Sequence, residues 1–223
     1  MDIKITKLMP KIYLLVFDTQ YRLCMSMLRI QEFYESPKFK GKCFELEEFM
    51  EYWCENFGSK GAFDYPCVWR GFNFPGKTLG KWMALCDKIR NPYRKCEEEV
   101  MNLICDMVIK NKEKLNDVYI IATYEKNPEI KTTIDHEIAH AFYAFYPEYR
   151  KSCSMLLKKA DKRKVDSAIE MLLRLGYSKK FLKDEIQAYF STYNTAKDLM
   201  PILDFCRNFE DFKKTIENNR KTV

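Results

Sequence analysis

Residues 133–143 read Thr133-Ile134-Asp135-His136-Glu137-Ile138-Ala139-His140-Ala141-Phe142-Tyr143, and they hold both histidines of the 223-residue chain. Residues four apart lie on the same face of a helix, so a helix here directs His136 and His140 at one point. Glu137 lies about 100° round the helix from His136, where it can reach a water without binding the metal itself. This is the H-E-x-x-H pattern, in which two histidines bind zinc and the glutamate is a general base. The stretch therefore predicts a zinc site.

The residues around the motif support a helix. Thr133 is a suitable N-cap, and Pro147 would end the helix after about three turns. A separate apolar stripe recurs at helical spacing and would be buried, and it consists of Ile134, Ile138, Ala141, Phe142 and Phe145. The competing interpretation is an ordinary amphipathic helix with two surface histidines. That interpretation explains the stripe but gives no reason for a glutamate between the histidines.

Composition limits the class of protein. Hydrophobic residues make up 47% of the chain and aromatic residues 15%, which is enough for a substantial core. The net charge of +6 is mild and indicates at most a basic patch. Nine cysteines, an odd number without a C-x-x-C pair, argue against a disulfide framework. The longest apolar run near the N-terminus, residues 12–17, is too short to span a bilayer or to serve as a signal peptide. We therefore expect a cytoplasmic protein without a membrane segment.

Patterning along the chain predicts an α+β fold. Strands are expected over residues 3–17, with a break at Pro10, and over residues 118–124. Helical patterns occur between and after them, with expected positions at 19–36, 44–53, 77–89, 91–114, 133–146, 165–175, 178–190 and from about 209. We find no internal repeat and no glycine-rich phosphate loop. A single domain spanning residues 1–223 is the expectation.

Residues 63–76 form the least ordinary stretch outside the motif, because they combine five aromatic side chains with two prolines and lack a helical period. One interpretation is that the segment packs over the core. The other is that it lines a substrate groove, since loops on a rigid scaffold often determine specificity.

A catalytic zinc needs three protein ligands and an open position. No histidine remains, so a carboxylate or a cysteine must be the third ligand. Glu185 and Asp184 are adjacent candidates on a predicted helix, and only one of them can face the metal. Another acid or a cysteine also stays open.

The motif resembles that of the zincin metallopeptidases, and in particular of the gluzincins, in which a glutamate on a following helix completes the site. Glu185 is the matching position, since residues 185–190, Glu-Ile-Gln-Ala-Tyr-Phe, look like the E-x-x-A pattern of that family. Leu199-Met200-Pro201 is similar to a segment of the ImmA/IrrE-type peptidases. The chain departs from the gluzincin pattern at Tyr189, where the family often has an aspartate that orients a histidine.

The resemblance implies a zincin-like fold, with a small mixed sheet, an active-site helix and a mainly helical C-terminal part. Residues 118–201 would form the metal-site core, residues 202–223 a C-terminal helix and tail, and residues 1–117 a part of unassigned function. The expected ligands are His136, His140 and Glu185.

The implied activity is a zinc metallopeptidase that acts on a protein or peptide substrate. Glu137 would be the catalytic base, and a tyrosine, Tyr143, Tyr189 or Tyr193, would stabilise the oxyanion. Two alternatives remain. One is a zincin-fold binding or regulatory protein without peptidase activity. The other is a nucleic-acid-associated protease, suggested by the basic run from Arg150 to Lys164.

Overall fold

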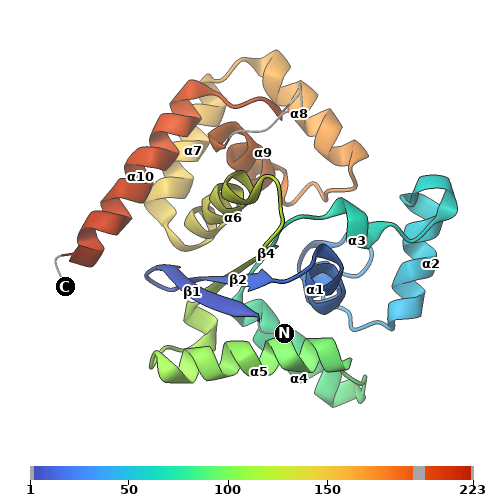
Figure 1. The fold of residues 1–223 in the computed structure, drawn as a ribbon. Helices are drawn as coiled ribbons and strands as arrows, with labels where there is room; N and C mark the ends of the chain where they lie inside the picture. The colour runs from blue at the N-terminus through green and yellow to red at the C-terminus, as the bar shows by residue number, and fades with distance from the viewer. Residues whose placement is uncertain (1–2, 193–198, 222–223) are drawn as a thin grey trace.

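A four-stranded mixed sheet forms the centre of the molecule (Figure 1), in a computed structural model that describes residues 3–192 and 199–221. The strands are β1 (Lys4–Met9), β2 (Ile12–Phe17), β3 (Phe72–Pro75) and β4 (Tyr119–Tyr124), and their order is β1-β2-β4-β3. β1 and β2 form an antiparallel hairpin, β2 pairs with β4 in parallel, and β3 pairs with β4 antiparallel. The predicted strand break at Pro10 is the turn of this hairpin.

β4 is buried along its whole length, because helices cover both faces of the sheet. Its β-branched and aromatic residues suit such a central strand. Side chains alternate between the faces: Ile120 and Ala122 belong to one core, while Tyr119 and Ile121 belong to the other. The sheet thus separates two hydrophobic cores.

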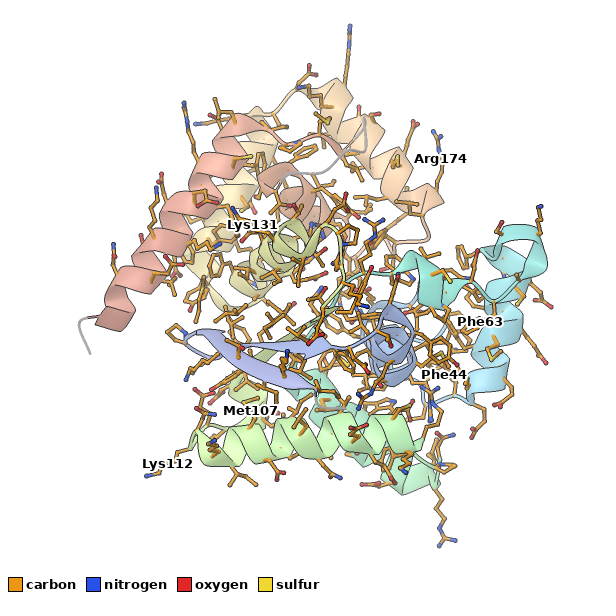
Figure 2. The ribbon with its side chains drawn as sticks, in the orientation of Figure 1. Phe44, Phe63, Met107, Lys112, Lys131 and Arg174 are labelled. Carbon is orange, nitrogen blue, oxygen red and sulfur yellow. The ribbon has the colours of Figure 1, made fainter. Side chains whose placement is uncertain are left out.

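The first core lies under helices from the N-terminal half. These are α1 (Gln20–Glu35), α2 (Leu46–Asn56), α3 (Tyr65–Val68), α4 (Gly76–Ile89) and α5 (Lys95–Lys110), with short 3-10 turns at Ser59–Gly61 and Leu115–Asp117. Figure 1 shows α4 and α5 beneath the sheet and α2 at the periphery beside α1. Met107 points from α5 toward the sheet, and Phe44 and Phe63 lie near α2, in the region beside α1 (Figure 2).

A buried ion pair joins α1 to α5 inside this first core. Arg29 Nη1 lies 3.1 Å from Glu97 Oε2, and the two side chains are 1% and 0% exposed. The same Arg29 nitrogen donates to the carbonyl of Pro92, and the Glu97 carboxylate also accepts from the Arg94 backbone. Both charged side chains therefore have hydrogen-bonding partners although they are buried away from water.

The second core lies under the C-terminal helices. These are α6 (Ile130–Phe145), α7 (Pro147–Lys159), α8 (Lys162–Arg174), α9 (Leu182–Ser191) and α10 (Leu203–Lys221). In Figure 1, α6 lies next to the sheet, and α7, α9 and most of α10 lie farther from the sheet than α6 does. The prediction of an α+β fold with a small mixed sheet and a mainly helical C-terminal part is confirmed. Within residues 3–192 and 199–221, no helix is both long and apolar enough to cross a membrane.

Candidate metal centre

The motif lies on α6, which begins at Ile130, one turn earlier than predicted. Thr133 is therefore inside the helix, and its prediction as N-cap is wrong. Asn127 explains the early start: its Oδ1 accepts from the Glu129 backbone, and its Nδ2 donates to the Thr133 hydroxyl at 2.9 Å. An asparagine that binds the backbone two residues on favours such a turn. The predicted end at Pro147 is correct, since α7 begins there.

Packing of α9 against α6 brings three candidate ligands together. Ligand atoms of His136, His140 and Glu185 all lie within 4.8 Å of one another. The two histidine Nε2 atoms are 3.2 Å apart, and His140 Nε2 is 3.6 Å from Glu185 Oε2. The intervening helices α7 and α8 return the chain so that α9 lies beside α6. The sequence spacing alone did not establish this proximity.

These residues fit a bound zinc ion. Glu185 is 4% exposed, yet its Oε2 is buried without a hydrogen-bond partner in the described part of the chain. A buried carboxylate oxygen without a donor is costly unless a cation satisfies it. Two imidazole nitrogens and one carboxylate oxygen are a common donor set of catalytic zinc, with one position left open.

Burial and neighbouring charges shift the ionisation of all three groups. Burial, together with His140, lowers the pKa of His136 well below its usual value. Burial also opposes charge on His140, but Asp184 and Glu185 outweigh it and raise the pKa of His140 well above its usual value. Burial raises the pKa of Glu185. The low-pKa imidazole is neutral at pH 7 and has a lone pair to offer a metal.

Asp184 occupies a different place from Glu185. Its Oδ1 lies 2.9 Å from His140 Nδ1, the ring nitrogen opposite the one that faces Glu185. Gln187, which is fully buried, donates to the same Asp184 oxygen at 3.1 Å and to the Ala139 carbonyl at 3.2 Å. Asp184 thus has the position of a carboxylate that orients a metal-binding histidine. The position of Tyr189 lacks the expected aspartate, and Asp184, one turn earlier on α9, contacts the histidine instead.

Glu137 faces the edge of the sheet and has its own polar support. Its side chain is 6% exposed, and its Oε2 accepts a hydrogen bond of 2.5 Å from Asn73 Nδ2 on β3. Asn73 Oδ1 in turn accepts from the Tyr119 hydroxyl on β4. Burial raises the pKa of Glu137 to about 7, against the opposing effects of His140 and Asn73. A carboxyl group with this pKa can both accept and donate a proton near neutral pH.

Gly71 allows β3 to approach Glu137 closely. A Cβ at this position would lie 2.5 Å from Glu137 Oε1 and 2.6 Å from Thr133 Cγ2. Both separations are shorter than van der Waals contact, so only glycine fits without a shift of its neighbours. Sequence reasoning missed Gly71 and Asn73 as individual residues, although it singled out the aromatic stretch that contains them.

A cavity of about 580 Å³ opens beside these groups. The two histidines, Glu137 and Glu185 line one side of it. The other walls come from α1, from residues 68–73, and from Tyr177 and Tyr189. Both interpretations of the aromatic stretch therefore apply, to different parts of it. Phe74 is buried in the first core, residues 68–71 and Asn73 line the cavity, and Tyr65 and Phe72 belong to the core and also border the cavity.

Among the candidate oxyanion tyrosines, Tyr189 lines the cavity, and its ring lies 4.5 Å from that of His136. Tyr143 is absent from the cavity wall, and Tyr193 lies outside the described residues. Tyr177, which the sequence patterns did not single out, lines the cavity next to Leu175 at the end of α8. Tyr177 and Tyr189 are thus two tyrosines from the C-terminal part of the chain that line this cavity.

The geometry is that of an H-E-x-x-H site completed by a downstream glutamate. Comparisons with protein-family models, with curated proteins and with solved structures gave no match for this chain, so the similarity to zincins rests on the motif and on the site itself.

Proposed function

We propose that the protein is a zinc-dependent peptidase. The observation that carries the proposal is the buried group of His136, His140 and Glu185, with Glu137 beside it on the wall of the same cavity. Three protein ligands and an adjacent carboxylate that does not belong to the ligand group are what hydrolytic zinc chemistry requires. The cavity volume lies in the range of small-molecule and peptide sites.

Zinc held by these three side chains would act as a Lewis acid, which lowers the pKa of a water and polarises a carbonyl group. Glu137 performs the proton transfers. Asn73 holds its Oε2, which leaves Oε1 to take the proton of the attacking water and pass it to the leaving amine. Asp184 fixes the tautomer of His140 by accepting from Nδ1, so that Nε2 presents its lone pair.

The walls of the cavity position the substrate. β3 is the edge strand of the sheet and borders the cavity, and an edge strand can pair with an extended peptide. Tyr177 and Tyr189 line the cavity, and one of these two tyrosines would donate to the oxygen that becomes negative as the carbonyl is attacked.

The test combines metal analysis with a cleavage assay. We expect about one zinc per chain in the wild type, loss of zinc when both histidines become alanine, and retention of zinc in Glu137→Ala. Cleavage of a diverse peptide library should fall by roughly 10²- to 10⁴-fold in Glu137→Ala, because proton transfer then has no positioned base. Protein that stays metal-free after preparation with excess zinc would refute the proposal.

The alternative of a binding or regulatory protein makes a different prediction. It requires zinc-loaded wild type to leave every peptide intact, or to cleave no faster than Glu137→Ala. Two features favour this alternative, namely residues 1–117 without an assigned function and the absence of an aspartate at the position of Tyr189; Asp184, which contacts His140 Nδ1, weakens the second. A nucleic-acid role gains no support from the site, since no residue of the basic run 150–164 appears among the described residues that line the cavity.

A further inference from the structure

A smaller pocket of about 60 Å³ adjoins the main cavity on the side of α1. The two share Glu32, Glu35, Trp53, Phe57, Trp69 and Tyr177 as wall residues. A water-sized group needs about 10–15 Å³ of such space, so the pocket can take the end of one long side chain. It is therefore a side chamber of the proposed substrate site.

Neither carboxyl group of this side chamber is in a close ion pair, although Lys40 and His140 attract the charge of Glu35 from a longer distance. Among the described residues, no lysine or arginine nitrogen lies within 4 Å of Glu32 or Glu35 in any ion pair. Glu32 accepts only neutral donors such as the Tyr65 hydroxyl at 3.0 Å, and Glu35 accepts from Gln31 Nε2 at 2.8 Å.

The arginines at the rim of the main cavity do not fill this role. Arg70 pairs with Glu129, and Arg174 pairs with Glu170 at 3.2 Å. Each rim cation therefore has an acid of its own. No close cation of the described residues therefore satisfies the two carboxyl groups, and a cation that enters the side chamber can pair with them.

Gln31 gives independent evidence of a missing donor. Its side chain is only 6% exposed and lines the main cavity beside Glu32 and Glu35. Its Nε2 is used by Glu35, but its Oε1 is buried and has no hydrogen-bond partner. A buried acceptor without a donor is rare in folded proteins and often marks the place of a ligand or ion. Here the missing partner must be an N–H or O–H group.

The walls of the side chamber also suit a cation. Aromatic faces attract positive charge, and this pocket is lined by Phe49, Tyr52, Trp53, Phe57, Trp69 and Tyr177. Burial, with Glu35 nearby, raises the pKa of Glu32 to about 8, and burial raises that of Glu35 as well. Desolvation raises the pKa of a carboxyl group in this way, and a bound cation would lower it again.

We propose that the side chamber lined by Glu32, Glu35 and the aromatic walls, with Gln31 beside it on the wall of the main cavity, is a specificity subsite for a positively charged nitrogen group of the substrate peptide. The group is either a lysine or arginine side chain or the amino terminus of the peptide. Charge-assisted hydrogen bonds to the carboxylates, a hydrogen bond to Gln31 Oε1 and contact with the aromatic rings would hold it. This inference rests on the proposed function, because it assumes that the main cavity binds a peptide.

The experiment measures binding, so that it does not depend on turnover. Zinc-loaded Glu137→Ala is titrated with heptapeptides of alanine that carry one lysine at each position in turn, capped at both ends. Matched peptides carry norleucine in place of lysine, and a third set of norleucine peptides has a free amino terminus. We expect binding of the best lysine peptide, or of the uncapped set, to be at least about tenfold tighter than that of capped norleucine peptides.

Substitutions then assign the preference to the side chamber. Glu32→Gln and Glu35→Gln together, added to Glu137→Ala, should reduce the tenfold ratio to about one. The matched control is Glu51→Gln with Glu55→Gln, which removes the same charge from the exposed surface of α2 and should preserve the ratio. Circular dichroism confirms that each variant is folded.

Equal affinity for charged and neutral peptides, including no binding of either, would overturn the subsite. A preference that persists after loss of both glutamates would overturn it too. Failure of the proposed function looks different: wild type would then leave the lysine peptides intact although the inactive variant still prefers them.

Discussion

Gly71, just before β3, leaves no room for a side chain next to the proposed base. Because an added Cβ would lie 2.5 Å from Glu137 Oε1, Gly71→Ala must displace either β3 or the carboxylate. We expect the variant to bind zinc normally and to lose roughly 10- to 100-fold in kcat/KM, since a displacement near 1 Å costs about that much in a catalytic group. Metal analysis and peptide cleavage measure the two properties separately.

Gly80→Ala on α4 is the matched control for Gly71→Ala. Its Cβ would meet Leu115 at 3.5 Å, which is ordinary contact. Replacing a helical glycine by alanine should keep activity and stabilise the protein by up to about 1 kcal/mol. Full activity of Gly71→Ala would show that Glu137 can move without loss and that its position next to β3 is unimportant.

The neighbours Asp184 and Glu185 should differ in their effect on zinc. Glu185→Ala removes a proposed ligand, and we expect zinc to be lost during dialysis together with turnover. Asp184→Ala leaves the ligands in place but removes the acceptor on His140 Nδ1, so zinc affinity should fall by roughly 10- to 100-fold. Competition with a chelator of known affinity measures both variants.

At saturating zinc, Asp184→Ala should still bind one ion. If instead Asp184→Ala loses zinc entirely while Glu185→Ala keeps it, the ligand and the orienting residue have exchanged roles.

Helix α1 contributes to two different parts of the molecule. Arg29 lies inside the first core with Glu97, while Glu32 and Glu35 face the cavity. Arg29→Met would leave the Glu97 charge without its buried partner from α1. We expect a loss of about 3–5 kcal/mol in the free energy of unfolding, measured by urea denaturation.

Adding Glu97→Gln to Arg29→Met should restore part of this loss, because no charge then remains buried between α1 and α5. A cost below about 1 kcal/mol for Arg29→Met alone would mean that Arg94 is a sufficient partner for Glu97.

The sequence predicted most elements because their signals are local. Alternating or β-branched residues identified β2 and β4, and helical spacing identified α1, α2, α5 and α6. The sequence-based prediction placed the start of α6 one turn too late. The turn before the helix is stabilised by Asn127, which bonds Glu129 and Thr133, and not by Thr133 as N-cap. The pairing of Asn73 with Glu137 had no local signal at all, since it depends on β3 lying beside β4.

At the level of the whole molecule, stability should depend on pH through Glu32. Its pKa is about 8 in the folded protein against a usual 4.5, so the folded state keeps a proton that the unfolded state releases. The contribution of Glu32 to the free energy of unfolding is therefore fully present below about pH 4.5 and is lost as pH rises toward 8. A carboxylate in a salt bridge has the opposite effect, because it stabilises the protein more as pH rises.

Glu32→Gln removes this titration while it keeps a side chain of the same shape. The difference in Tm, variant minus wild type, should be larger at pH 8 than at pH 5, as measured by thermal unfolding in matched buffers. A difference that does not change with pH would show that Glu32 is solvated well enough to ionise normally.

The proposed site also draws on residues from both halves of the chain. The ligands come from α6 and α9, but α1 and residues 68–73 form much of the cavity wall. Residues 1–117 had no function that the sequence could assign, because their contribution consists of shape and of single polar contacts. Their place in the structure gives them a part in holding Glu137 and in shaping the cavity.

The parallel pairing of β2 with β4 bears on how the protein is made. This pairing joins Ile12 to Tyr119 and Phe17 to Tyr124, partners separated by nearly half of the chain. Such a pairing is slow, because the loop between the strands must close before its contacts form. During synthesis on the ribosome, β2 cannot pair with β4 until β4 has emerged, and α6 and α9 emerge later still. The histidines and Glu185 thus reach one another after the sheet can close, and metal capture becomes a late event in folding.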